Sequence, residues 1–301
     1  NSSAASDVYK RQDSHNTEEL IRGSKAGADY LLSIKDETYH ILENLDSYPV
    51  LIPTDNNMPN FYKLIDRAVQ DKLTFIADPI LDPISYGFTK SIERYIYLRE
   101  KYPDIHIMIG IGNITELTHA DTSGINMIML GIVEELKLNH ILTTQVSRHC
   151  STVIRETDLA RRIIHAASEN NITPKHINNG LLINHGHKDY AYTSDELSDM
   201  KSNIKDKNYR IYVNDDGVHL FNKTIYKVFS DPYDFYEFLE VDEDSGHSFY
   251  LGVELARAQI AYQLRKEYSQ DEELDWGCLI DKKADNKLQS KELGPTFKKR
   301  K

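Results

Sequence analysis

Cysteine, long apolar runs and an excess of basic residues are all missing from this sequence. Two cysteines in 301 residues, Cys150 and Cys278, cannot build a disulfide framework, which predicts a reducing, cytoplasmic environment. No apolar run approaches the roughly 18 residues that would span a bilayer, so we expect no membrane segment. Acidic residues outnumber basic ones by 47 to 36, a net charge of −11, which argues against nucleic acid as a partner.

An initiator methionine is also absent. Ser2–Gln12 (SSAASDVYKRQ) resembles the in-frame translation of a sequencing adapter, so residues 1–12 are set aside as adapter-derived or disordered. A short disordered tail of genuine sequence is the alternative. The adapter interpretation predicts an N-terminally truncated fragment, with native sequence upstream.

From residue 13 the chain alternates between short apolar, β-branched runs and stretches with helical periodicity. Each predicted strand is followed by a helix, and the unit length of about 28 residues is close to the roughly 31 of a complete eight-unit barrel. The predicted strands are 28–34, 49–53, 73–77, 105–111 and 140–144. An open doubly wound sheet has similar spacing, and periodicity does not separate the two folds.

The alternation stops near residue 170, where the composition changes. Residues 170–201 are predicted to be a linker, and residues 202–280 a small α+β domain that contains a hairpin at Tyr209–Val213 and Val218–Phe221 around an Asn-Asp-Asp-Gly turn. The charged tail 281–301 is predicted to be disordered. The barrel part is then 13–169.

Catalytic and binding groups of parallel β/α proteins lie at the C-terminal ends of the strands. Those positions carry carboxylates, amides and hydroxyls, with Arg148 as a rare cation. Such a set suits a neutral planar heterocycle better than a phosphate, because Asp accepts two adjacent N–H groups and Asn pairs with ring nitrogen or oxygen. The candidate binding residues are Ser33, Asn56, Asp78, Asp82, Asn113 and Gln145.

The segment DPILDPI (78–84), followed about thirty residues later by MIGIGNIT (108–115), resembles the pterin-binding barrel family of dihydropteroate synthases and corrinoid-linked methyl-tetrahydrofolate methyltransferases. Longer segments are similar to dihydropteroate-synthase-related proteins of archaea and some one-carbon-metabolising bacteria, a resemblance that covers most of residues 20–280. These segments are DPILDPISYGF, GNITELTHADTSG, LTTQVSRHC, FYLGVELARAQIA and QDEELDWG.

The resemblance implies a site as well as a fold. The five units would be strands four to eight of a (β/α)8 barrel, with a small α+β domain after them. Asp78 would hold the amino group and ring N–H of a reduced pterin, of folate or methanopterin type, and Asn113 would be the catalytic residue beside the reduced ring. Asn56 and Ser33 would occupy neighbouring strand ends, and no metal is expected.

Two departures from dihydropteroate synthases bear on activity. Gly112-Asn113-Ile114 stands where those enzymes carry Ser-Arg-Lys, and Thr144-Gln145 where they carry a final Arg. The missing cations handle pyrophosphate and aminobenzoate, which puts ordinary dihydropteroate synthesis in doubt.

The sequence therefore predicts a pterin-binding transferase of one-carbon cofactor metabolism. The alternative is a non-catalytic pterin carrier or sensor, whose C-terminal domain docks a protein partner or a second copy of the chain. A barrel enzyme with an unrelated ligand is a third possibility. Each candidate also has a purely structural interpretation: Asp78 as a turn former, Asp82 as a helix cap and Asn113 as a loop hydrogen-bonding group.

Overall fold

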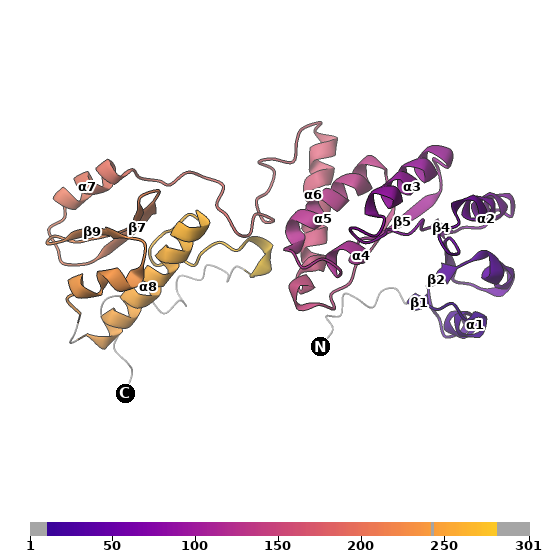
Figure 1. Ribbon diagram of the computed structural model, residues 1–301, viewed down its shortest axis with the longest axis horizontal. Helices are drawn as coiled ribbons and strands as arrows, with labels where there is room; N and C mark the ends of the chain where they lie inside the picture. The colour runs from indigo at the N-terminus through magenta and orange to yellow at the C-terminus, as the bar shows by residue number, and fades with distance from the viewer. Residues whose placement is uncertain (1–10, 242–243, 282–301) are drawn as a thin grey trace. The chain divides into compact units, whose positions relative to one another are not determined.

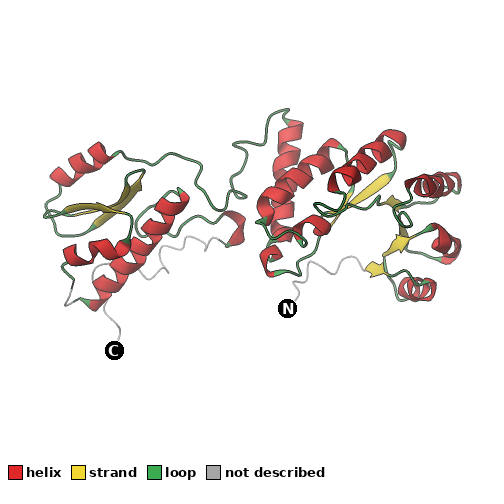
Figure 2. Cartoon of the chain, viewed as in Figure 1, coloured by secondary structure: helices red, strands yellow, loops and turns green. Residues whose placement is uncertain are grey.

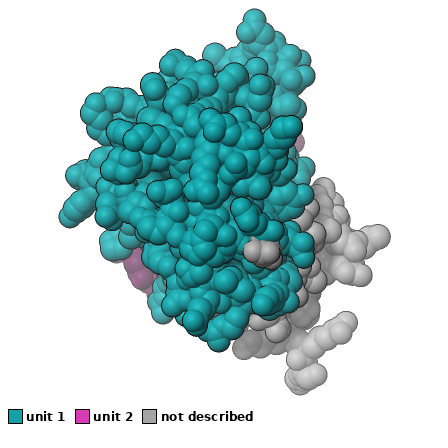
Figure 3. Space-filling model, turned by 90° about the vertical axis from the view of Figure 1, so that its right-hand side faces the viewer, with its two compact units in different colours: residues 1–177 teal, residues 178–301 magenta. Residues whose placement is uncertain are grey.

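The computed structural model describes residues 11–241 and 244–281, which fall into two compact units, residues 1–177 and 178–301 (Figures 1 and 3). Each unit is built around its own sheet, as the strands in Figure 2 show. In the described part of the chain, no helix combines the length and apolar character that a membrane crossing requires.

The first unit is a parallel sheet of six strands in sequential order, β1 to β6, joined by helices (Figure 1). The strands are β1 (Arg11–Asp13), β2 (Tyr30–Ile34), β3 (Tyr48–Leu51), β4 (Ile76–Ala77), β5 (His106–Gly110) and β6 (His140–Leu142). Between them lie α1 (Thr17–Lys25), the 3-10 helix η1 (Asp36–Asn44), α2 (Met58–Gln70), α3 (Phe88–Lys101), α4 (Gly112–Thr115) and α5 (Thr122–Glu135). The 3-10 helix η2 (Arg148–Cys150) and α6 (Val153–Glu169) end the unit.

Side chains alternate along the strands between two apolar environments. Leu31, Leu51, Ala77 and Ile107 are fully buried on the face that the helices cover. The helices contribute residues spaced three and four apart, such as Phe61, Leu64, Ile65 and Ala68 of α2. Val50, Ile76 and Met108 form a second cluster with Leu32 and Leu142 on the opposite face of the sheet.

The sheet is curled and open. Asp13, at the end of β1, and Leu142, at the end of β6, line the same cavity although four strands separate β1 from β6. A sequential strand order with right-handed crossovers places the connecting helices on one face, as in a barrel. A doubly wound sheet would instead reverse its strand order.

The prediction that the sheet consists of strands four to eight of a (β/α)8 barrel is wrong. Six strands form one half-barrel sheet, and β1 begins at Arg11, inside the segment that was set aside; its pairing of Arg11 with Tyr30 and Asp13 with Leu32 continues the parallel order. The physical reason is that hydrophobic periodicity reports which faces are covered. It reports neither the number of strands nor whether the last strand pairs with the first.

The second unit has a three-stranded antiparallel sheet between two helices. Its elements are α7 (Ser194–Ser202), β7 (Arg210–Asn214), β8 (Gly217–Phe221), β9 (Tyr226–Phe229), the 3-10 helix η3 (Pro232–Phe238), α8 (Ser245–Leu264) and the 3-10 helix η4 (Gly277–Leu279). The hairpin predicted around the Asn-Asp-Asp-Gly turn is present as β7 and β8. All of helix α7 except its last residue falls in the segment predicted to be a linker, and residues 282–301 of the predicted tail are outside the described residues.

The core of the second unit lies between the sheet and α8. Ile211 and Leu220 of the sheet meet Leu251, Leu255 and Ala258 of the helix, all of them buried. On the other face of β8, His219 is buried and bridges Asn214 Oδ1 and the hydroxyl of Tyr226, at 2.6 and 2.9 Å. Both faces of β8 are therefore covered.

Candidate functional site

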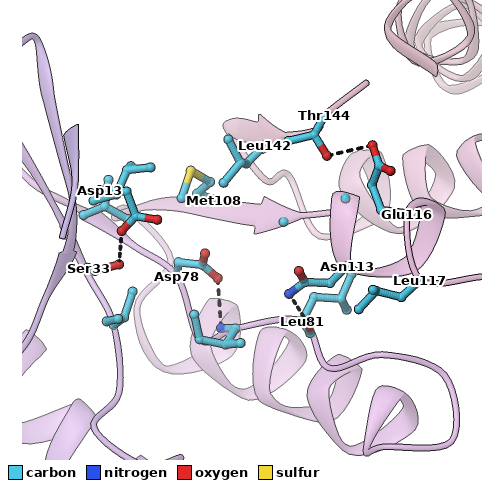
Figure 4. A pocket seen from close by; sticks show the side chains of 16 residues that line it. Asp13, Ser33, Asp78, Leu81, Met108, Asn113, Glu116, Leu117, Leu142 and Thr144 are labelled. Atoms are coloured by element: carbon cyan, nitrogen blue, oxygen red, sulfur yellow. Dashed lines mark hydrogen bonds between the residues drawn. The ribbon is translucent and has the colours of Figure 1, made fainter. Parts of the chain in front are cut away.

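A cavity of about 300 Å³ opens at the C-terminal ends of the strands in the first unit (Figure 4). Its apolar wall comes from the inner face of the sheet: Leu32, Val50, Ile52, Met108 and Leu142. Its polar groups follow the strand ends: Asp13, Ser33, Asp78, Asn113, Glu116 and Thr144. Ligand sites have this composition, an apolar surface with a few fixed polar groups.

Asp78 directly follows β4 and is 5% exposed. Its Oδ1 accepts hydrogen bonds from the Ile80 amide and from the buried Tyr95 hydroxyl, both at 2.9 Å. Among the described residues nothing donates a hydrogen bond to Oδ2, and Figure 4 shows the carboxyl group directed into the cavity. One oxygen therefore fixes the side chain and the other faces the cavity.

Burial dominates the electrostatics of Asp78. Loss of solvent raises the pKa of its carboxyl to about 6, and the hydrogen bonds from Ile80 and Tyr95, together with the charge of Arg94, oppose that rise. The same burial and the neighbouring carboxylate raise the pKa of Tyr95 well above its ordinary value. At neutral pH Asp78 is a carboxylate and Tyr95 a neutral donor.

The loop after β4 carries backbone strain at the cavity wall. Ile80 has φ = 64°, a left-handed conformation that is unfavourable for a β-branched residue. Its N–H bonds Asp78 and its carbonyl accepts from the guanidinium of Arg94, which also pairs with Asp82 at 2.7 Å. These contacts hold a conformation that places Asp78 and Ile80 together in the wall.

Asn113 lies on α4, the short helix after β5, and also lines the cavity. Its Nδ2 donates to the carbonyl of Leu81 at 2.8 Å. That bond ties the loop after β4 to the loop after β5 and leaves the amide oxygen as the group that can meet a ligand. In this orientation the amide oxygen of Asn113 can accept a hydrogen bond from a ligand.

Asp13 and Ser33 form the opposite wall. The Ser33 hydroxyl donates to Asp13 Oδ1 at 2.7 Å, and Ser33 has φ = 68° at the point where the pairing of β2 with β3 is irregular. The bond joins the ends of two neighbouring strands, β1 and β2. A second carboxylate is thereby fixed across the cavity from Asp78 (Figure 4).

Glu116 anchors the loop after β6 at the cavity wall. Its carboxylate accepts from Val146 N at 2.8 Å, Ser147 N at 2.9 Å and the Thr144 hydroxyl at 3.1 Å. The backbone hydrogen bond from Val146, followed by the contact with Ser147, lowers the pKa of Glu116 to about 2, so it is ionised at physiological pH. Gly112 permits the close approach of the loop after β6, because a Cβ there would lie 3.1 Å from Thr144 Oγ1.

The wall is acidic. The described lining residues include three carboxylates and no lysine, arginine or histidine. Arg94 is nearby, but its guanidinium is committed to Asp82 and the Ile80 carbonyl. The arrangement favours a ligand that presents N–H donors or a positive charge and disfavours a phosphate. Within the described residues, no group of three or more potential metal ligands is present.

Three of the six predicted site residues come together here: Ser33, Asp78 and Asn113 all line the cavity. The other three lie outside its lining. Asn56 is exposed in a turn with φ = 56°, Asp82 is paired with Arg94, and Gln145 donates to the Ser151 carbonyl at 2.7 Å.

Sequence reasoning missed Asp13, Tyr95 and the structural role of Glu116. Asp13 was missed because the strand that it ends lay mostly in the segment set aside. Tyr95 sits on the buried stripe of α3, and a tyrosine at such a position usually indicates packing alone. Glu116 follows Gly-x-x-Asn by a few residues, and its partners lie thirty residues further on, so no local pattern marks it.

No protein-family model matches the chain. An uncharacterized protein of the archaeon Methanocaldococcus jannaschii is 30% identical over 307 aligned positions, which cover 87% of this chain and 57% of that protein. The chain thus spans a little more than half the length of this relative. A crystal structure from Chromobacterium violaceum, named as a candidate spore coat polysaccharide biosynthesis protein E, aligns with a TM-score of 0.41 at 12% identity over 66% of this chain and 56% of that one.

Proposed function

We propose that the first unit binds a reduced pterin and that the protein is a cytoplasmic enzyme of one-carbon cofactor metabolism, related to dihydropteroate synthases. The proposal depends above all on Asp78, a buried carboxylate with one oxygen fixed by Ile80 and Tyr95 and the other facing the cavity. The amino group and adjacent ring N–H of a pterin supply the donors that such an oxygen needs. A charge-assisted hydrogen bond of this kind contributes about 1.5–3 kcal/mol.

The rest of the cavity suits the body of the same ligand. Leu32, Val50, Met108 and Leu142 offer an apolar surface to a flat ring system. The amide oxygen of Asn113 can accept from an N–H of the reduced ring, because its Nδ2 is bonded to Leu81. In a transfer reaction Asn113 would orient the ring nitrogen, and the buried Asp78 would keep the pterin in register.

The acidic wall of the cavity limits the reactions that the site can support. Without a cation among the described lining residues, the wall has no group to stabilise a departing pyrophosphate. This observation favours methyl transfer to or from the reduced ring over dihydropteroate synthesis. It equally favours the second candidate, a pterin carrier or sensor that performs no chemistry and uses the second unit to dock a protein partner or another copy of the chain.

Calorimetric titration with tetrahydrofolate and 6-methyltetrahydropterin tests the binding. Asp78→Asn should weaken affinity at least tenfold, since it replaces an acceptor with a donor opposite the pterin N–H groups. Asp66→Asn is the matched control, because Asp66 also accepts from a tyrosine hydroxyl, that of Tyr102 at 2.7 Å, and does not line the cavity. Absence of binding to both pterins would refute the proposal.

Assays of turnover distinguish the two candidate functions, a transferase and a non-catalytic pterin carrier or sensor. Incubation with 5-methyltetrahydrofolate and a methyl acceptor, or with a dihydropterin pyrophosphate and 4-aminobenzoate, should give product if the protein is a transferase. Binding without turnover in either assay would favour the carrier.

A further inference from the structure

The 3-10 helix η3 of the second unit exposes two tyrosines on one side. Phe235 is fully buried and Phe238 half-buried, whereas Tyr233 is 87% exposed and Tyr236 72% exposed, so burial along the helix repeats every three residues. Residues three apart in a 3-10 helix lie directly above one another, about 6 Å apart along its axis. Tyr233 and Tyr236 therefore form one exposed aromatic column.

An acidic column borders this aromatic column. Asp234 and Glu237 are also three residues apart on η3, and both are exposed. Among the described residues neither carboxylate has a salt-bridge partner, whereas the next one, Glu240, pairs with Lys207 at 3.4 Å. Residues 231–244 contain seven carboxylates and no lysine or arginine. The two tyrosines thus stand in a strongly negative field.

The same helix already holds one cation against an aromatic ring. Lys227 of β9 places its Nζ 3.9 Å from the ring centroid of Phe238, on the side of η3 that faces the sheet. A cation over an aromatic face is attracted by the ring quadrupole. The aromatic column offers the same interaction to a cation from solvent, and the acidic column offers it a counter-charge.

We propose that the aromatic column and the acidic column together form a docking surface for an extended, arginine-bearing segment of a partner protein. A guanidinium group stacks flat on a tyrosine ring and pairs with a carboxylate through two parallel N–H groups, which an ammonium group cannot do. Alternate residues of an extended segment lie about 6.5–7 Å apart, close to the separation of the two tyrosines. The match favours a segment with arginine at every second position.

The charge of the surface also selects the kind of partner. Seven carboxylates in fourteen residues attract a basic segment over a distance and repel nucleic acid and anionic lipid. The inference concerns the second unit alone and does not depend on what the cavity of the first unit binds.

The test titrates the full chain into a fluorescein-labelled peptide of alternating arginine and glycine and follows fluorescence anisotropy. The wild-type protein should bind this peptide more tightly than the corresponding lysine–glycine peptide. Tyr233→Ala and Tyr236→Ala should each weaken binding about two- to fivefold, and the double variant about tenfold. Phenylalanine at either position should preserve binding, because it keeps the aromatic face.

Two further variants separate stacking from charge. Asp234→Asn combined with Glu237→Gln should weaken binding and reduce its dependence on salt concentration. Tyr86→Ala is the matched control, because Tyr86 is an equally exposed tyrosine (84%) that belongs to the first unit, and it should leave the affinity unchanged. All of these variants alter exposed side chains, and an unchanged circular dichroism melt verifies that each one folds.

Several results would overturn the assignment. Absence of peptide binding at about 1 mM protein and low ionic strength would do so, as would equal affinity of the wild type and the double tyrosine variant. A wild-type dimer that the double variant dissolves, measured by sedimentation velocity, would assign the surface to a second copy of the chain instead. Peptide binding that tightens about tenfold when the four basic residues 298–301 are replaced by glutamine would assign it to the end of this chain.

Discussion

Replacing Asp78 by Asn should stabilise the first unit at neutral pH while it weakens ligand binding at the proposed site. Burial raises the pKa of Asp78 from an ordinary value of 3.8 to about 6, so the folded protein prefers the protonated carboxyl. The stability that this preference contributes is complete below about pH 4 and is lost as the pH rises through 6. The free energy of unfolding should therefore fall by roughly 2–3 kcal/mol across that window.

Asparagine removes this pH dependence. Its side-chain oxygen can still accept from Ile80 and Tyr95, and it carries no charge to be desolvated. At pH 7.5 we expect Asp78→Asn to unfold with a free energy roughly 2–3 kcal/mol above that of the wild type, whereas at pH 4 the two should agree. Such a gain would show that the ionised carboxylate of Asp78 lowers the free energy of unfolding of the wild-type protein.

Urea unfolding followed by far-ultraviolet circular dichroism at pH 4.0, 5.0, 6.0 and 7.5 measures the effect. The single tryptophan, Trp276, belongs to the second unit, so its fluorescence gives a separate transition that should shift less. Asp66→Asn serves again as the control, because Asp66 does not line the cavity. An Asp78→Asn protein that is less stable than the wild type at pH 7.5 would refute the reasoning, because it would show that the negative charge stabilises the loop.

Three further predictions concern buried and strained groups of the first unit. Glu156→Ala should cost about 2–4 kcal/mol in urea unfolding, since the buried carboxylate accepts three side-chain hydrogen bonds, whereas Asp158→Ala, on the exposed side of the same helix, should cost less than about 1 kcal/mol. Ile80→Gly should change the unfolding free energy by less than about 1 kcal/mol, because relief of a left-handed φ offsets the lost side chain, and a loss above about 3 kcal/mol would contradict this. Burial, and then the nearby charge of His106, lowers the pKa of His140, so the stability that the neutral imidazole contributes is lost as the pH falls below about 6.5. The melting temperature of His140→Asn should therefore fall less than that of the wild type between pH 7.5 and 5.5, and equal falls would refute the assignment.

Local patterns in the sequence were sufficient for much of the first unit. Phe61, Leu64, Ile65 and Ala68 recur in the sequence at helical spacing, and these are the residues that α2 buries. Asp78 was predicted to stand at a strand end, and it directly follows β4; its role as a ligand group stays a prediction. Such predictions succeed because helix periodicity and strand ends depend on residues close together in the chain.

Other features depend on residues that the fold brings together, and the sequence did not show them. Asn56 and Gln145 are strand-end amides like Asn113, yet of the three only Asn113 lines the cavity. Gln145 donates to the Ser151 carbonyl, although its neighbour Thr144 does line the cavity. The bond between Glu116 and the Val146 amide closes a gap of thirty residues, and no spacing rule anticipates it.

The sequence by itself determined the β/α alternation, the buried face of α2 and the carboxylate that follows β4. Only the tertiary structure decided that six strands form an open, curled sheet, and that Asp13, Asp78 and Glu116 share one cavity without a cation among its described lining residues. The reason is physical: apolar periodicity fixes which side of an element is covered, whereas strand number, curvature and the meeting of distant loops depend on hydrogen bonds and packing between segments that are far apart in the chain.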